Sequence, residues 1–435
     1  MSALERLLGE FAALAASDAG MDGAGRRDTG ADAAAAALRA QGLPTRRDEN
    51  WHYADLRALE GIRQFRAAPP AQRTADAQLP EPLEGHARLV YIDGVLAGGS
   101  PLPASPALTR LPVAAVAASP PADPSGEFAG DARMGLVARM FAPEPLALRV
   151  TGSAALEIVH LASSTAANCH SHVRIELDAG ASLSLVERQL GFGALVAEHL
   201  PPAALHCSNL ELRLGAGAQL RHTRLQQAAG HALRFNTLSA ELGAQAVYQL
   251  CQLAAGDGSE RTTAQFRLQG RAASLRIAAL AAARGAQSAD SQFSIVHAAP
   301  ATRSEQLFRG IASDRAQVSC SADVRAEATA PGARVQQSLR GLIDGPGAAV
   351  NLRPRLTINT DDIQAQHGAT TGRLDENLLF YLLARGLEPA TARSLLKWAL
   401  LGEVFTAVEP APLRRAAERA VAVQLRDATA TELLQ

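Results

Sequence analysis

Two short segments of the chain carry the residue types that ligate metals or move protons. The first, Cys169-His170-Ser171-His172, is the densest group of soft metal ligands, and in a strand its two histidines lie on one side and its cysteine on the other. Two histidines at this spacing can bind one metal ion, but a zinc or iron site needs further ligands, which His206-Cys207 could supply. Alternatively, both cysteines are small interior residues and the two histidines lie outward at the surface.

The second segment runs from Thr360 to Thr370 and contains Asp361-Asp362 followed by His367-Gly368. Paired carboxylates and an imidazole could hold a metal or act as acid and base. Alternatively, the segment is a junction between a strand and a helix, because Asp and Thr favour turns and Gly368 permits backbone angles closed to other residues. The pattern alone leaves both interpretations open.

Four aromatic residues near the C-terminus form a third candidate: Phe380, Tyr381, Trp398 and Phe405. Aromatic residues at helical spacing usually belong to a core. A pair of helices outside a β domain has little core of its own, however, so these side chains could instead dock onto a partner protein.

Composition excludes several classes of function. The chain has 435 residues, and its 42 basic and 43 acidic residues leave a net charge of −1, which predicts binding neither to nucleic acid nor to an anionic membrane. Its only lysine, Lys397, is followed by Trp398, so no GxxxxGK[ST] loop is present and we expect no bound nucleotide. No apolar run approaches the roughly 20 residues of a membrane helix. Four cysteines without a CxxC pair are typical of reduced thiols, which predicts a cytoplasmic protein.

The elements that must position these residues fall into three parts. Residues 1–145 are a helical and mixed region, with a helix interrupted at 20–30 and a hairpin centred on Asp93-Gly94. Residues 146–368 alternate apolar and polar positions in short strands, and residues 369–435 return to helical spacing in three helices.

The strands end at turns that recur along the chain. Each of these turns is centred on a glycine: Gly180, Gly217, Gly243 and Gly270. Short strands with recurring glycine turns favour a β-solenoid, in which each turn of the coil buries its apolar face on the next. A β-sandwich is the alternative.

Several motifs resemble the signature of the SufB/SufD family, the scaffold proteins of SUF iron–sulfur cluster assembly. The series runs from Asp361-Asp362-Ile363 through His367-Gly368-Ala369-Thr370 to Leu379-Phe380-Tyr381 and Arg385-Gly386. Leu307-Phe308-Arg309-Gly310-Ile311 and the segment 43–51 also match. Within the family, the His-Gly-Ala-Thr form is similar to the SufD branch, since SufB usually has a glutamate near this point.

The resemblance implies a mainly β fold, a right-handed parallel β-helix between an N-terminal helical region and a C-terminal helical domain. It implies a non-catalytic scaffold subunit that pairs with a SufB-like paralogue through the C-terminal end of the β-helix and binds a SufC-like ATPase through the helical tail. By this resemblance His367 is the ligand for iron or a transient iron–sulfur cluster shared with SufB. Asp361, Asp362 and Gly368 belong to the interface motif, and the ATPase-binding residues are Phe380, Tyr381, Arg385, Trp398 and Phe405.

The resemblance leaves a flavin site, the oligomeric state of the isolated chain and the effect of Ala365 unassigned. Flavin has been linked to the family's complex, but no residue here places a flavin site, and the isolated chain could form a homodimer. Relatives often carry a cysteine two residues before the histidine, where this chain has Ala365. Without that thiol, His367 is the more important candidate ligand.

Two other functions serve as alternatives. One is an extracellular β-helix enzyme that processes polysaccharide, which predicts a secretory signal and exposed aromatic residues. The other is a SufB-type paralogue that carries the cluster itself, against which Ala365-Gln366-His367-Gly368 argues.

Overall fold

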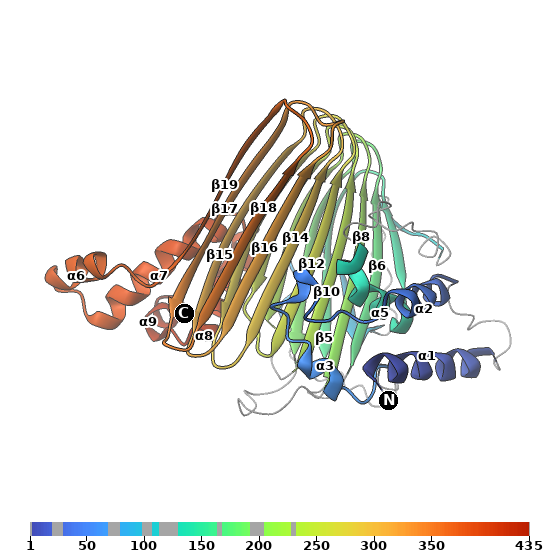
Figure 1. The fold of residues 1–435 in the computed structure, drawn as a ribbon, viewed down its shortest axis with the longest axis horizontal. Coiled ribbons are helices and arrows are strands. Elements are labelled where there is room, and N and C mark those ends of the chain that lie inside the picture. The colour runs from blue at the N-terminus through green and yellow to red at the C-terminus, as the bar shows by residue number, and fades with distance from the viewer. Residues whose placement is uncertain are drawn as a thin grey trace.

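The computed structural model describes residues 2–19, 29–67, 79–97, 107–112, 129–162, 168–191, 204–227 and 232–434. Its centre is a parallel β-solenoid in which successive long strands alternate between two sheets that face each other (Figure 1). This confirms the predicted mainly β solenoid between helical regions, and the β-sandwich is wrong. The division of the chain at 145/146 and 368/369 stays a prediction.

From β4 onward, odd-numbered strands form sheet A and even-numbered strands form sheet B; of the first three strands, β1 and β2 lie in sheet A and β3 lies in sheet B. Sheet A contains β1 (Ala87–Ile92), β2 (Val95–Leu96), β5 (Ser153–Ala162), β7 (Ser182–Gly191), β9 (Gln219–Gln227), β11 (Val247–Ala254), β13 (Ser274–Ala283), β15 (Arg303–Ser313), β17 (Ala333–Asp344) and β19 (Ile363–Gly372). Sheet B contains β3 (Leu108–Arg110), β4 (Leu146–Val150), β6 (Cys169–Leu177), β8 (Ala204–Leu214), β10 (Ala232–Leu242), β12 (Ser259–Leu268), β14 (Ser288–His297), β16 (Gln317–Ala326) and β18 (Ala349–Ile358).

Helices flank the solenoid at both ends of the chain. The α-helices are α1 (Ala3–Ala19), α2 (Thr29–Gln41), α3 (Arg57–Gly61), α5 (Arg133–Phe141), α6 (Glu376–Ala384), α7 (Pro389–Phe405), α8 (Ala411–Gln424) and α9 (Ala428–Leu433). The 3-10 helices are η1 (Glu49–Trp51) and η3 (Ala129–Ala132). Among the described residues, no helix combines the length and the apolar character needed to cross a membrane.

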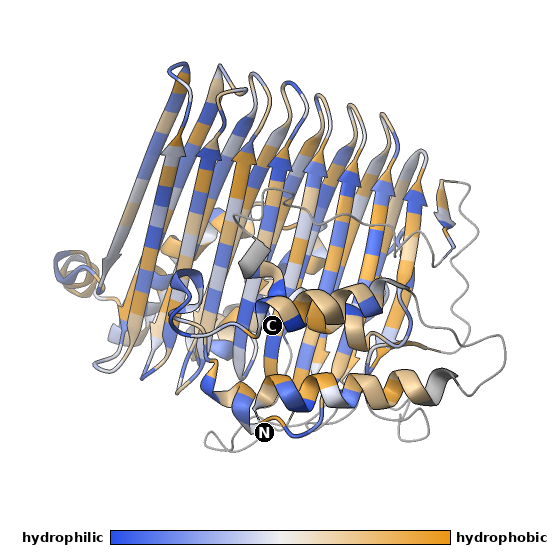
Figure 2. Ribbon diagram, turned by 45° about the vertical axis from the view of Figure 1, so that its right-hand side comes forward, coloured by the Kyte–Doolittle hydropathy of each residue, from blue (hydrophilic) through white to orange (hydrophobic). Residues whose placement is uncertain are grey.

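The period of two builds the interior of the solenoid. Because alternate side chains of each strand point to the same side, Val173, Ile175 and Leu177 enter one core together with the corresponding residues of both sheets. Figure 2 shows apolar and polar residues alternating along the strands. The strands pair in parallel register, so that Leu250, for example, lies between His222 and Ile277. Each turn of the solenoid therefore covers the apolar edge of the one before it.

The predicted glycine turns are present, but the glycines serve two different purposes. Gly180 and Gly217 have φ values of +72° and +67°, in the left-handed region that favours glycine. At Gly270 a Cβ atom would instead lie 2.0 Å from the backbone N of Ala244, so glycine is needed because the turns stack closely. In that turn the left-handed residue is Ala272, with φ of +59°.

The N-terminal helices cover the outer face of sheet B. Phe11, Trp51 and Phe141 pack there against Cys207 and Phe235, which point away from the solenoid interior. Helices α1 and α2 confirm the predicted interrupted helix, and most of the interruption lies outside the described residues. The predicted hairpin is confirmed as β1 and β2, and β1 also pairs in parallel with β5, which extends sheet A.

Helices α7 and α8 cover the outer face of sheet A. Leu401, Val404 and Phe405 of α7 pack with Leu253 and Leu280, so these helices share a core with the solenoid. The expectation that the tail has little core is therefore wrong. The last of the three helices predicted in 369–435, expected over 412–434, is in fact two helices, α8 and α9. Arg426 has φ of +51°, which a right-handed helix does not accommodate, and Asp427 accepts a hydrogen bond from the backbone N of Ala430 at the start of α9.

Two buried histidines predict that the fold loses stability in mild acid. Burial lowers the pKa of His170 and of His297 to about 4, from about 6.5 in an unfolded chain. A depressed folded-state pKa means that the stabilising contribution is complete above pH 6.5 and is lost as the pH falls toward 4. We expect each histidine to cost about 2 kcal/mol of unfolding free energy between pH 7 and pH 5.

Urea unfolding at several pH values measures this loss. The variant His297→Asn should show a clearly shallower decline between pH 7 and pH 5 than the natural chain, whatever its stability at pH 7. His52→Gln, which changes an exposed imidazole, is the matched control and should keep the natural slope. Parallel curves for all three proteins would contradict the prediction.

Candidate functional site at the open end of the solenoid

The solenoid ends at the strands β18 and β19, which are the last members of their sheets. Among the described strands, β18 pairs only with β16 and β19 only with β17. The outer edges of both strands therefore lie at the same end of the molecule, which Figure 1 shows on the side opposite β6. Most residues of β19 are exposed. A long exposed edge of this kind is a template for pairing with another strand.

His367 lies in the middle of this edge, in β19. Ile363 and Ala365 of the same strand pack against the end of the interior core, and His367 continues on their side of the strand because side chains alternate. Its neighbour in register is Gln337, which is itself in register with Gln306. The imidazole is exposed, so the structure places it where the interior of the solenoid opens to the outside.

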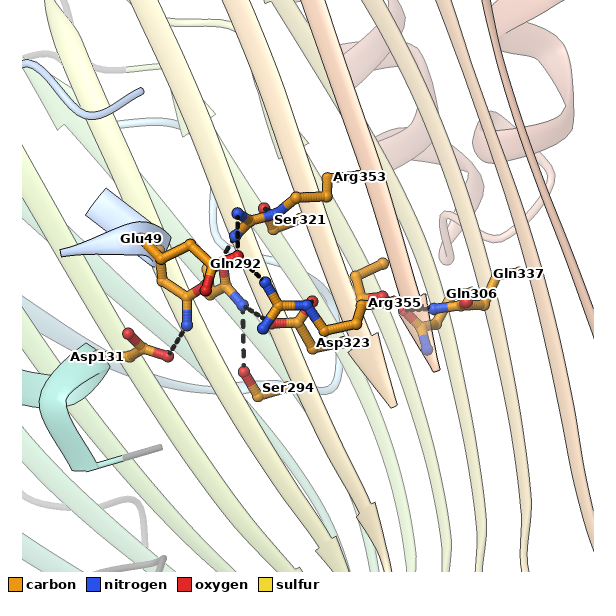
Figure 3. Close-up of polar contacts among 12 residues, drawn as sticks. Glu49, Asp131, Gln292, Ser294, Gln306, Ser321, Asp323, Gln337, Arg353 and Arg355 are labelled. Atoms are coloured by element: carbon orange, nitrogen blue, oxygen red, sulfur yellow. Dashed lines mark hydrogen bonds and ion pairs between the residues drawn. The ribbon is translucent and has the colours of Figure 1, made fainter. Parts of the chain in front are cut away.

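The two glutamines behind His367 are buried and only partly paired. The Nε2 atom of Gln337 donates to the carbonyl O of Ala322 at 2.8 Å and lies 3.4 Å from Oε1 of Gln306. The Oε1 atom of Gln337 and the Nε2 atom of Gln306 have no hydrogen-bond partner among the described residues. Figure 3 shows the pair side by side on neighbouring strands. The ladder that ends at His367 is therefore polar where the rest of the interior is mostly apolar.

The residues that the resemblance assigns to an interface motif lie in the turn that precedes β19 and in β19 itself. Asp361 and Asp362 are exposed, and the backbone O of Asp362 accepts a hydrogen bond from the N of Gly332 at 2.8 Å. Gly368 lies inside β19 with no left-handed φ, and a Cβ atom there would meet nothing within 4 Å. The segment is thus a turn and a strand, and the helix begins only at Glu376. The packing of the described residues does not require glycine at 368, and the space above it is open.

His367 is an exposed imidazole at the open end, and imidazole is a side chain that can ligate iron. Among the described residues, no group of three or more His, Cys, Asp or Glu lies close enough together to hold a metal ion. The histidine and the two aspartates of the motif therefore do not form such a group within the part of the chain that is described. A complete iron site at His367 would therefore need ligands from beyond the described residues around it.

The residues of the cluster around Cys169 point to opposite sides of sheet B. His170 and His172 are buried beneath the N-terminal helices, where His170 donates to the carbonyl O of Phe65 and His172 lies 3.0 Å from Glu211. They are not surface residues, contrary to one interpretation. Cys169 lies beside His206 in register on the interior side. Cys207 points outward into the helical core, contrary to the same interpretation, and burial raises the pKa of its thiol.

The aromatic residues of the tail separate into two groups. Phe380 and Tyr381 lie on α6 with 72% and 53% of their surfaces exposed, and the Arg385 guanidinium sits 4.8 Å from the centre of the Tyr381 ring. No residue of α6 is buried against the described chain, and Figure 1 shows this helix projecting from the solenoid. In contrast, Phe405 is 3% exposed and stacks at 5.5 Å on Trp398, whose Nε1 donates to Asp427.

Two ion pairs fix α7 to sheet A. Arg309 of β15 is buried, donates to the carbonyl O of Ser338 at 2.9 Å and pairs with Glu403. The Nζ atom of Lys397 lies 2.6 Å from Oδ2 of Asp344 at the end of β17. Sequence reasoning missed both acidic partners. The only signal was a lysine placed alone within an apolar helix.

The neighbours of Arg309 in the motif 307–311 also have defined positions. Phe308 enters the interior core. A Cβ atom at Gly310 would lie 2.8 Å from Cγ1 of Val318, so a larger residue there would crowd the interior. The motif thus joins the core, the sheet and α7 at one place.

Comparison with known proteins identifies the family. Residues 160–400, which run from β5 to α7, match the family model described as "SUF system FeS cluster assembly, SufBD core domain". The chain is similar to an iron–sulfur cluster assembly SufBD family protein of Synechocystis, with 26% identity over 86% of this chain and 85% of the relative. It is also similar to the iron–sulfur cluster assembly protein SufD of Escherichia coli, with 26% identity over 86% of this chain and 87% of the relative. Because the family model covers more than half of the sequence, the chain belongs to the SufB/SufD family of iron–sulfur cluster assembly proteins.

Proposed function

We propose that the chain is a non-catalytic, SufD-type scaffold subunit of a cytoplasmic SUF complex. It pairs with a SufB-like paralogue through the open end of the solenoid, binds a SufC-like ATPase through α6, and presents His367 to iron or a nascent cluster. The observation that carries this proposal is the position of His367 on an exposed strand edge at the end of the interior.

Strand pairing at this edge favours β19 over β18. Pro354 lies within β18 and has no backbone N–H to donate, whereas β19 contains no proline. Since successive N–H groups of a strand point to alternate sides, β19 offers about five donors to a partner strand. A SufB-like solenoid that adds its own last strand here would bring its side chains next to His367. The same edge could pair two copies of this chain when the partner is absent.

The chemistry of His367 suits a shared, labile site. A neutral imidazole nitrogen is a good iron ligand, and a histidine ligand changes the properties of a cluster relative to full cysteine ligation. The family resemblance assigns the remaining ligands to a cysteine and a glutamate of the partner. Ala365 lies on the same side of β19 as His367 and supplies no thiol, so the histidine is this chain's contribution.

The tail would connect the ATPase to this site. The exposed apolar surface of α6 suits a groove on a SufC-like partner. The adjoining α7 is fixed to β15 through Arg309–Glu403 and to β17 through Lys397–Asp344, and β17 is the direct neighbour of β19. ATP-driven movement of α6 and α7 would thus strain the strands beside His367 and expose it to iron or sulfur. The partner supplies the nucleotide chemistry in this proposal, and no residue assigns a flavin.

Co-expression with SufB-like and SufC-like partners tests the proposal. Size-exclusion chromatography with light scattering should give one complex, and a chain that remains a lone monomer would overturn the scaffold role. The variant Ala369→Arg adds a charge to an exposed position of β19 and should weaken pairing at least tenfold, because a charge that becomes buried without a partner is costly. Gln249→Arg, on the exposed face of β11 away from the edge, is the matched control and should pair normally.

A further inference from the structure

A short N-terminal segment reaches the last strand of sheet B. We call Asp48–Trp51 the N-terminal clamp; it consists of η1 and the residue before it. Glu49 accepts a hydrogen bond from Nη1 of Arg353 at 3.2 Å and is also contacted by Nη2 of Arg355. Both arginines belong to β18, about 300 residues further along the chain, and Figure 3 shows them converging on Glu49.

Asn50 uses both ends of its amide in this contact. Its Nδ2 atom donates to Oδ2 of Asp131 at 2.9 Å, and its Oδ1 atom accepts from Nη2 of Arg353 at 2.7 Å. The Nε atom of Arg353 donates to Ser321 of β16 at 3.1 Å. The guanidinium of Arg353 is thus held on three sides, by Ser321 of the neighbouring strand and by two residues of the clamp.

The clamp itself is anchored over earlier strands. Trp51 is buried, the guanidinium of Arg261 in β12 lies 3.9 Å from the centre of its ring, and Phe235 of β10 lies 5.9 Å away. Asp48 accepts from Thr45 and from Arg133 of α5 at 2.7 and 2.8 Å. The segment is therefore fixed at one end to the body of the molecule and contacts the edge strand at the other.

This contact bears on pairing because β18 is held by a single neighbouring strand. An edge strand with one partner is easily displaced, and its outward arginines would otherwise be free to move. Isolated surface ion pairs contribute little, but here two arginines, a carboxylate and an amide form one network beside the buried carboxylate of Asp323, whose Oδ1 lies 3.9 Å from Arg355. The expected effect is local order in β18, with little change in global stability.

We propose that Glu49 and Asn50 are positioning residues for the pairing edge, which hold β18 in the conformation that the partner solenoid meets. The N-terminal clamp is then part of the partner-binding surface, although it lies outside the solenoid. This inference rests on the proposed function, in which a SufB-like chain pairs with the open end.

Hydrogen exchange in the isolated full chain gives the first readout. In the double variant Glu49→Ala/Asn50→Ala, amides of 349–358 should exchange about three- to tenfold faster, whereas those of β14 should keep their natural rate. Arg355→Met removes the contact from the other side and should give the same pattern. Adding Arg355→Met to the double variant should have little further effect, because the groups act through one network.

Affinity for the SufB-like partner gives the second readout. The double variant should raise the Kd up to about tenfold, since β18 is then less ordered in the free chain and must be ordered when the partner binds. The Kd of Glu49→Gln, which keeps an acceptor of the same shape, should lie between that of the natural chain and that of the double variant. Glu60→Gln is the matched control: Glu60 is exposed and pairs only loosely, at 3.9 Å, with Arg6, and this variant should bind normally.

The outcomes separate the two proposals. If the natural chain pairs and the double variant pairs equally well, or if β18 exchanges at its natural rate in the variant, the positioning role is overturned and the proposed function stands. If the natural chain does not pair with the partner at all, both the proposed function and the positioning role of Glu49 and Asn50 are overturned. Faster exchange in β18 together with weaker pairing supports the role of the N-terminal clamp.

Discussion

Replacing His367 by alanine is expected to leave the complex with the SufB-like and SufC-like partners assembled while the yield of cluster falls tenfold or more. The imidazole is exposed in the isolated chain, so its removal leaves no cavity and the fold should keep its stability. Loss of a residue that merely orients a metal ligand already costs about 10- to 100-fold in affinity, and loss of the ligand itself should cost at least as much. Iron and acid-labile sulfide per complex measure the yield.

The control for this variant is Gln249→Ala, which truncates an exposed side chain of β11, several strands away from the edge. It should leave the cluster yield unchanged. A natural yield in His367→Ala would refute the ligand role. Ala365→Cys in the His367→Ala background adds a thiol on the same side of β19, and partial recovery of cluster would locate the site at this strand independently.

Replacing Phe380 and Tyr381 together by serine is expected to release the SufC-like ATPase while pairing with the SufB-like chain continues. Both side chains are largely exposed on a helix with no buried residue, so the variant should unfold at the natural denaturant midpoint. Buried aromatic anchors at interfaces commonly contribute 2 kcal/mol or more each, which predicts a loss of affinity of about 100-fold or more for the pair. Titration calorimetry with the isolated ATPase measures it.

Val423→Ser provides the control for the aromatic pair, because Val423 is also an exposed apolar residue of the tail, 59% exposed on α8. It should bind the ATPase normally. Unchanged binding by the Phe380/Tyr381 double variant would show that α6 is not the docking helix. Phe405→Ala is a useful contrast: it should destabilise the chain by about 3–5 kcal/mol, since this ring lies in the core between α7 and sheet A.

The solenoid was predictable because its interior imposes a local pattern. One face of every strand enters the same core, so residues such as Val173, Ile175 and Leu177 repeat with a period of two, and the turns require small residues. The pattern does not reveal what covers the other face. His170 and Cys207 were misplaced for this reason: the outer face of sheet B lies under the N-terminal helices, so both faces are buried there.

The candidate site was predictable only where its residues are consecutive. His367 and its neighbours form one run in the sequence, and the family resemblance implied the role that we propose for them. The contacts that support the site join distant segments, as Glu49 does with Arg353 and Glu403 does with Arg309. A charged residue on an exposed helix or turn looks the same whether or not a distant arginine faces it, so no local signal exists for such pairs. The same limit hid the difference between Phe380 and Phe405, whose helical spacing is alike.

The N-terminal clamp also constrains how this protein can evolve. Solenoids commonly change length by duplication or loss of a repeat, because each repeat contacts only its neighbours. Here Trp51 is seated at β12 and Asn50 reaches β18, so the segment spans three strand spacings, about 14 Å. One inserted repeat between those strands would move β18 away by about 4.8 Å, more than a hydrogen bond can stretch. The segment therefore constrains the number of strands that can lie between β12 and β18 in this fold.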